Sequence, residues 1–355
     1  MNTILECEIK PLNQQALISA REKIDHLAKP LGSLGKLEDM AIQMAGIFGE
    51  IPFTLGWKRV VVFASDNGVW NEGISPVPQS VTLKQAVNMT RGLTGVCAMA
   101  RYAGCEVKVV DMGINAHVKC PEMIDRKLAM GTRNIAQGPA MSREQAYQAL
   151  MTGFELAKQA KAQGVRVLAA GEMGICNTTT SAAVLSALTG MPATDTVGKG
   201  AGLTEEQFQK KRQVVERALE INQPDPGDPI GVLQKVGGFD IGGMAGLYIG
   251  SAAAGLPVVV DGFIAMVAAA LAVRIRPEVK NYLFASHVSN EKAFMAAAQA
   301  VGVKPYLDMG MRLGEGSACP LAMMMMEAAL RMAHDMLSFD EADIDINDYI
   351  DIRGE

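Results

Sequence analysis

Short apolar runs rich in β-branched residues recur along the middle of the chain, and each one stops at an Asp, Ser or Gly. The runs cover residues 60–64, 107–110, 165–170, 257–260 and 282–285. Longer Ala-rich stretches with helical spacing separate them, at residues 80–103, 143–163 and 205–221. Nearly continuous apolar strands that alternate with helices are typical of a parallel sheet covered on both faces. The pattern therefore predicts an α/β fold, a doubly wound and mainly parallel sheet with helices on both faces, which binds ligands beyond the carboxyl ends of its strands.

The two ends of the chain have a different pattern, with apolar residues at helical spacing and no strand-like runs. Residues 14–27 and 37–48 predict two helices, and a run that contains four consecutive methionines predicts a third over 321–337. We expect the terminal segments, residues 1–45 plus 330–355, to form a small helical domain. Residues 46–329 then form the large α/β domain.

Composition excludes several classes of protein. The 355 residues carry a formal net charge of −5, whereas a nucleic-acid protein is usually basic. The longest apolar stretch, residues 244–260, contains several glycines and Pro257, which predicts a buried helix, a turn and a strand rather than a membrane span. Six cysteines without C-x-x-C spacing and four histidines without H-x-x-x-H predict neither a disulfide framework nor a metal site. With no apolar secretory segment at residues 1–15, we expect a cytoplasmic protein with reduced thiols.

Polar residues embedded in glycine mark the candidate chemistry. Residues 171–180 (GEMGICNTTT) follow a predicted strand and open a helix, so Gly174, Asn177 and the threonines offer a helix N-terminus suited to phosphate. The alternative is that Asn or Thr only caps the helix. Residues 197–203 read G-x-G-x-G, a weak dinucleotide fingerprint because the third glycine has the wrong spacing.

Two glutamates have glycine neighbours that let a ligand approach closely. Glu315 lies between Gly314 and Gly316 and precedes an apolar helix, which makes it a candidate general base. Glu172 follows Gly171, and the pair can face one cleft. The alternative for each is a loop residue or a cap acceptor. Because a P-loop, a G-x-S-x-G elbow and paired metal-binding acids are all absent from the sequence, an enzyme here handles a phosphate ligand without an evident metal.

Seven motifs, in this order along the chain, resemble one enzyme family. They are KPLGSLGKLE (29–38), SDNGVWNEG (65–73), QAVNMTRG (85–92), GEMGICNTTT (171–180), KVGGFDIGGMAG (235–246), SHVSNEK (286–292) and MRLGEGS (311–317). The family is the nicotinate-nucleotide:5,6-dimethylbenzimidazole phosphoribosyltransferases of cobalamin lower-ligand assembly. The resemblance implies transfer of 5-phosphoribosyl from nicotinate mononucleotide to an aromatic base, with inversion at the anomeric carbon and with no cofactor or metal.

The resemblance also implies a role for each matching residue. Glu315 would be the general base, and Glu172 a supporting carboxylate near the ribose and the departing ring. The 5′-phosphate would be held by Gly174, Asn177, Thr178, Ser289 and Lys211. The acceptor ring would lie against Val77, Gln85, Met173 and Leu313. The partners implied are the two substrates and a second subunit that completes each cleft, with no nucleic acid and no membrane.

Some positions depart from the family pattern. Val77 stands where a serine is common and Met173 where a leucine is common, which gives the acceptor wall a more apolar and adaptable surface. These departures raise the hypothesis that the acceptor is a phenol or cresol and that the chain is one half of a heterodimer. A further alternative is a non-catalytic subunit that completes a partner's site. An oxidoreductase is the alternative from pattern alone, and the missing G-x-G-x-x-G counts against it.

Overall fold

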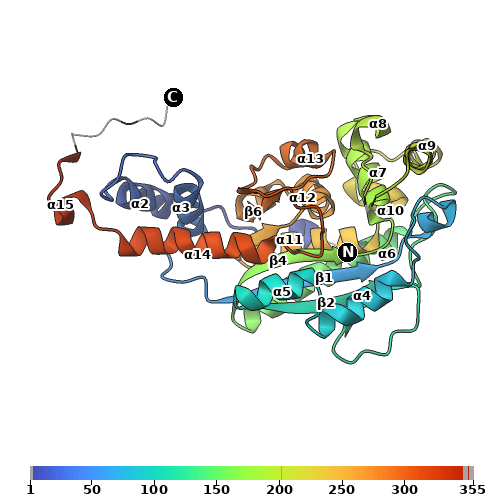
Figure 1. The fold of residues 1–355 in the computed structure, drawn as a ribbon, viewed down its shortest axis with the longest axis horizontal. Coiled ribbons are helices and arrows are strands. Elements are labelled where there is room, and N and C mark those ends of the chain that lie inside the picture. Colours follow the sequence, from blue (N-terminus) through green and yellow to red (C-terminus); the bar gives the residue numbers. More distant parts are fainter. Residues whose placement is uncertain (1–2, 201, 347–350, 352–355) are drawn as a thin grey trace.

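The computed structural model describes residues 3–200, 202–346 and 351, and its centre is a six-stranded parallel sheet (Figure 1). The strand order is β3-β2-β1-β4-β5-β6, and β7 and β8 form a separate two-stranded parallel sheet. The strands are β1 (Trp57–Ser65), β2 (Cys105–Gly113), β3 (Ile124–Asp125), β4 (Val165–Met173), β5 (Val258–Val260), β6 (Leu283–Ala285), β7 (His287–Val288) and β8 (Leu307–Asp308). The predicted doubly wound parallel sheet is confirmed.

Helices cover both faces of the sheet, because alternate residues of each central strand point to opposite faces. Val61 and Phe63 of β1 belong to one hydrophobic cluster, and Val60 and Val62 belong to the other. The first cluster takes in α1 (Thr3–Glu6), α6 (Arg143–Ala162), α7 (Asn177–Thr189), α8 (Ala193–Thr196), α9 (Glu205–Asn222), α10 (Pro229–Val236), α11 (Phe239–Ala253), α12 (Phe263–Ile275), α13 (Phe294–Val301) and the 3-10 turns η1 (Gly68–Glu72) and η2 (Pro277–Tyr282). The second takes in α2 (Gln14–Asp25), α3 (Lys36–Phe48), α4 (Val81–Thr90), α5 (Gly95–Tyr102) and α14 (Cys319–Asp335).

The apolar stretch at 244–260 is a buried helix followed by a turn and strand β5, as predicted. Helix α11 packs closely on α6, because a Cβ on Gly153 would lie 1.9 Å from the Gly243 carbonyl oxygen and glycine leaves that space free. Within the described ranges, the helices are all too short or too polar to cross a bilayer.

The terminal helices gather at one end of the molecule, where α2 and α3 lie beside α14 and α15 (Phe339–Ala342) (Figure 1). An antiparallel bridge joins Leu27 to Ser338, and Met323 and Met326 are buried. These helices share their hydrophobic cluster with one face of the sheet. The division at residues 45 and 330 stays a prediction, and the parts of the small domain at 1–2, 347–350 and 352–355 lie outside the described residues.

The predicted helical stretch at residues 80–103 forms two helices and not one continuous helix. Helix α4 ends at Thr90 and α5 begins at Gly95. Between them Gly92 adopts a left-handed φ of 75°, which ends the first helix and turns the chain. The break brings the start of α5 toward the ends of the sheet strands, where Val96 contacts the site described next.

Candidate active site

A cavity of about 400 Å³ opens beyond the carboxyl ends of β4 and β5. In a doubly wound sheet this is the edge where ligands bind, at the point where the strand order reverses. Here that point lies between β1 and β4, which are neighbours in the sheet although β2 and β3 separate them in the chain. The predicted site residues that line the cavity are Val77, Gln85, Glu172, Met173, Gly174, Asn177, Thr178, Ser289, Leu313 and Glu315.

Glu315 lies in a loop with an unusual backbone. Gly314, Glu315 and Gly316 have φ values of 82°, 65° and 84°, so three consecutive residues are left-handed. A non-glycine residue in this region is strained and persists only when its surroundings hold it. The Asp261 carboxylate supplies part of that support, because it accepts hydrogen bonds from the Gly316 and Ala318 amides at 3.0 Å each. Burial raises the pKa of Asp261 to about 7.

The Glu315 side chain is 5% exposed and has two donors that fix its orientation. Gln85 donates from Nε2 to Oε1 at 3.0 Å, and the Val96 amide donates to Oε2 at 3.2 Å. Gln85, expected at the acceptor ring, therefore also holds the carboxylate. The loop itself presses on strand β4, because a Cβ on Gly171 would lie 2.2 Å from the Glu315 carbonyl oxygen.

Glu172 belongs to a buried group of carboxyls joined by one amide. Its Oε1 accepts from the Glu315 backbone N–H at 3.2 Å, and its Oε2 accepts from Nδ2 of Asn177. The same Nδ2 donates to Oδ2 of Asp240 at 3.1 Å. Burial, reinforced by the nearby Asp240 carboxyl, raises the pKa of Glu172 to about 8, and burial raises that of Asp240 to about 6. At neutral pH Glu172 thus carries a proton for most of the time.

Gly174, Asn177, Thr178 and Lys211, expected to hold the phosphate, lie around the start of α7, whereas Ser289 follows β7 and lines the cavity beside Gly262. Thr178 lines the cavity, and its Oγ1 accepts from Nζ of Lys211 at 2.9 Å. Lys211 donates also to the Gly198 carbonyl at 3.0 Å, and burial lowers its pKa to about 8. Lys211 lies outside the main cavity, in an adjoining one of about 100 Å³ that shares Gly174, Asn177 and Thr178 with it. The Asn177 side-chain amide faces carboxyls, and its backbone N–H donates to the Gly174 carbonyl at 3.2 Å, so both donor groups of Asn177 are engaged within the protein.

Apolar side chains form much of the remaining wall. They are Val77, Val81, Met173, Ile175, Phe263 and Leu313. Leu313 is 59% exposed, which places it at the mouth of the cavity. Trp70 Nε1 donates to the Val77 carbonyl at 3.1 Å and so holds the segment that carries this part of the wall.

Sequence reasoning missed three acidic residues of this site. Asp261 follows strand β5 directly, and its place at the carboxyl end of a strand is a signal that points to it. Asp240 lies in the glycine-rich segment 235–246, where its partner Asn177 is distant in sequence. Glu291 lines the cavity, and burial raises the pKa of its carboxyl. In residues 3–200 and 202–346, the His, Cys, Asp and Glu side chains form no group of three or more arranged to hold a metal ion.

The chain is similar over most of its length to several known proteins. A curated nicotinate-nucleotide–dimethylbenzimidazole phosphoribosyltransferase of Clostridium perfringens is 45% identical, covering 100% of this chain and 98% of that protein. A protein of the same name from Yersinia enterocolitica is 47% identical, covering 95% of this chain and 96% of that protein. A crystal structure of the same-named enzyme from Thermus thermophilus has a TM-score of 0.89 at 40% identity, covering 94% of this chain and 99% of that one. The family model described as DBI_PRT, Phosphoribosyltransferase, matches residues 9–344, and the chain belongs to this phosphoribosyltransferase family.

Proposed function

We propose that the protein transfers the 5-phosphoribosyl group of nicotinate mononucleotide to 5,6-dimethylbenzimidazole or a related aromatic base, giving the α-nucleotide used in cobamide assembly. One observation carries the proposal. The carboxylate of Glu315 and the start of α7, with Gly174 and Thr178, line the same cavity, so one nucleotide and one base can lie between them. The names of the relatives support this choice of substrates.

The proposed reaction needs little assistance from a metal ion. The pyridinium ring of the donor already carries positive charge, so nicotinate leaves without an acid. The transition state resembles an oxocarbenium ion, as it does in glycoside hydrolysis. What remains for the protein is to hold the phosphate, to align the acceptor on the face opposite the leaving ring, and to remove the acceptor's proton. Attack from that face inverts the anomeric carbon from β to α.

Glu315 is the proposed base, since its buried carboxylate is held by Gln85 and the Val96 amide and lines the cavity. The helix N-terminus, Thr178 and Ser289 are the proposed phosphate contacts, and Lys211 adds positive charge through its bond to Thr178. Glu172, neutral for most of the time at neutral pH, supports the ribose and the leaving ring without adding a negative charge beside the phosphate.

The acceptor class is the part of the proposal that needs a direct test. Val77 and Met173 contribute an apolar wall, which also suits a phenol or p-cresol and an O-glycosidic product. The purified chain is incubated with nicotinate mononucleotide and each acceptor, and nicotinate release and nucleotide product are followed by chromatography. Efficient use of benzimidazole with no phenol product removes the phenol alternative, and the reverse result establishes it.

The same assay separates an enzyme from a non-catalytic subunit. We propose a dimer, either of two copies or with a paralogue, in which the neighbour completes the cleft. Activity of the purified chain alone, with a solution mass of twice 37.8 kDa, supports the homodimer. An inactive monomer that gains activity only with a paralogue supports the heterodimer, and a chain that releases no nicotinate with any acceptor or partner contradicts the proposed function.

A further inference from the structure

Thr82 is a fully buried residue of helix α4 whose hydroxyl joins two parts of the site. Its Oγ1 donates to Oδ1 of Asp66 at 2.7 Å and accepts from the Ile175 amide at 3.2 Å. The carbonyl of Ile175 accepts from Nδ2 of Asn67 at 3.3 Å. The peptide groups on either side of Ile175 are therefore both held by buried side chains that come from other elements.

The turn at 174–176 needs such support. Cys176 has a left-handed φ of 72°, and only glycine fits at 174, because a Cβ there would lie 2.2 Å from the Ser65 carbonyl oxygen. Strained backbone of this kind persists where its surroundings fix it. The turn leads directly into Asn177 and Thr178 at the start of α7, so its shape determines where that helix begins.

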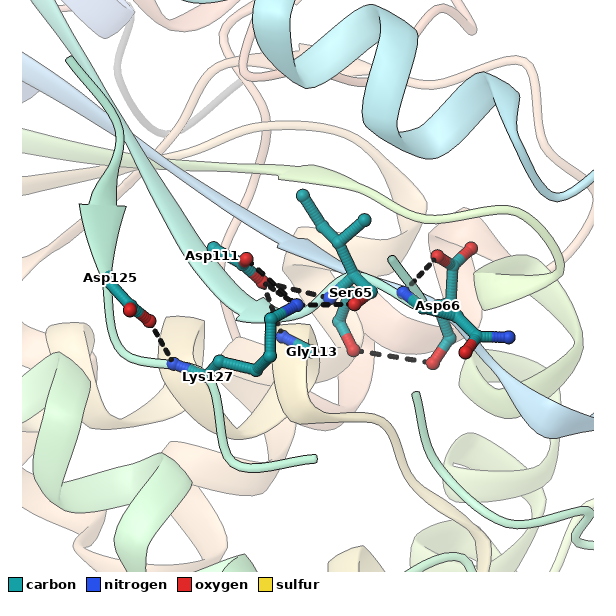
Figure 2. A network of polar contacts seen from close by, with 8 residues as sticks. Ser65, Asp66, Asp111, Gly113, Asp125 and Lys127 are labelled. Atoms are coloured by element: carbon teal, nitrogen blue, oxygen red, sulfur yellow. Dashed lines mark hydrogen bonds and ion pairs between the residues drawn. The ribbon is translucent and has the colours of Figure 1, made fainter. Parts of the chain in front are cut away.

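Asp66, which accepts the hydrogen bond from the Thr82 hydroxyl, has several other hydrogen-bond partners. Its backbone donates to the Gly113 carbonyl at 3.0 Å, and its Oδ2 accepts from the Asn115 amide at 2.8 Å. In Figure 2, Asp66 lies near Asp111 and Lys127. Nζ of Lys127 and Oδ2 of Asp111 form an ion pair of 2.9 Å, which holds the end of strand β2. Asp111 Oδ1 accepts from the Gly113 amide at 3.0 Å, which completes the link back to Asp66.

Helix α4 carries a second contact to the site, one turn further along. Gln85 lies three residues after Thr82, a spacing that places both side chains on one face of the helix. Gln85 holds the Glu315 carboxylate, whereas Thr82 holds the turn before α7. One face of α4 thus contacts both the residue proposed as base and the segment proposed to bind phosphate.

We infer that Thr82 is a positioning residue, which sets the turn at 174–176 so that the start of α7 receives the donor nucleotide. This inference rests on the proposed function, since it assigns the α7 end of the cavity to the donor. The hydroxyl of Thr82 satisfies the Ile175 amide and at the same time connects it to Asp66, which directly follows strand β1.

The test removes the hydroxyl and then restores it. Thr82→Val and Thr82→Ala remove both hydrogen bonds, and Thr82→Ser keeps them. Because a buried N–H is left without its partner, we expect KM for nicotinate mononucleotide to rise roughly 5- to 20-fold in the first two variants. KM for the acceptor base and the values for Thr82→Ser stay within about twofold of the wild type. Thr152→Val is the matched control, since this buried threonine of α6 bonds the Gln148 carbonyl of its own helix and lies outside the cavity.

The possible outcomes distinguish a failure of this inference from a failure of the proposed function. If the wild-type protein shows no phosphoribosyl transfer activity, the proposed function itself is contradicted. An active wild type with an unchanged donor KM in Thr82→Val and Thr82→Ala overturns the inference, as does an equal rise of the donor and acceptor KM values. A loss in Thr82→Ser as large as in Thr82→Ala also overturns it, because the hydroxyl is then not the reason. Titration of nucleotide binding gives the same comparison for a variant that binds but turns over slowly.

Discussion

Glu172 is a carboxyl group that the fold keeps away from water, and its replacement by glutamine makes stability depend differently on pH. The folded protein raises the pKa of this group from 4.5 to about 8, first through burial and then through the neighbouring Asp240 carboxyl. The folded state therefore binds more protons than the unfolded state between pH 4.5 and 8. The contribution of Glu172 to the free energy of unfolding falls as pH rises through this interval.

The size of this change in the free energy of unfolding follows from the interval between the unfolded and folded pKa values of Glu172. Each pH unit between the two pKa values changes the free energy of unfolding by about 1.4 kcal/mol. Glutamine does not titrate, so the difference in stability between Glu172→Gln and the wild type grows in favour of the variant as pH rises. From about pH 5.5 to 7.5 the growth is about 3 kcal/mol. A constant offset comes in addition, since glutamine has one oxygen for the Glu315 and Asn177 donors where glutamate has two.

The assay is denaturant unfolding of both proteins at several values between about pH 5.5 and 8.5, with the midpoint and slope fitted at each. The offset cancels because only the change with pH is compared. Glu220→Gln is the control for removal of an acidic side chain, because Glu220 is an exposed residue of α9 that lies outside the cavity. A stability difference that stays flat across this range refutes the reasoning, because it means that Glu172 is ionised throughout.

Three further predictions concern catalysis. Glu315→Gln should keep nucleotide binding and lower turnover by roughly 10²- to 10⁴-fold, as measured by steady-state kinetics and titration; an equal loss of donor binding marks a binding residue instead. Gly171→Ala should lower turnover by roughly 100-fold, because its Cβ displaces the Glu315 loop, and a circular dichroism melt distinguishes this from unfolding. Above about pH 8, kcat/KM for the nucleotide should fall, since Glu172 gains a negative charge while Lys211 loses its positive charge; a profile that stays flat to about pH 9 contradicts the assignment of these groups to the donor end.

The sheet was predictable because its central strands are buried on both faces. Such strands are short apolar runs that stop at polar residues, and β1, β2, β4, β5 and β6 all show this pattern. Strands β3, β7 and β8 have two residues each, too few for a period to be recognised. The break between α4 and α5 was missed because apolar residues continue on both sides of Gly92, although the glycines at 92 and 95 mark the place where the left-handed backbone turns the chain.

The site was partly predictable from glycine. Glu315 and Glu172 attract attention because their glycine neighbours leave room, and the structure shows the tight packing that requires those glycines. Asp261 and Asp240 were missed because their partners are 55 or more residues away in the chain. Lys211 lies in a lysine- and arginine-rich segment typical of a solvated helix, and the signal for it came from the resemblance to the family.

The buried acids explain how an acidic cavity accepts an anionic substrate. Four acidic side chains line the cavity: Glu172, Asp261, Glu291 and Glu315. If all four were ionised, their negative charges would repel the phosphate of a nucleotide in the same cavity. Burial raises the pKa of Glu172 to about 8 and that of Asp261 to about 7, so these two groups carry less negative charge at neutral pH than the sequence implies. Protonated carboxyls still serve as hydrogen-bond partners, which Glu172 and Asp261 use to hold the Glu315 loop. The same burial that fixes the loop thus lowers the charge that a nucleotide phosphate meets.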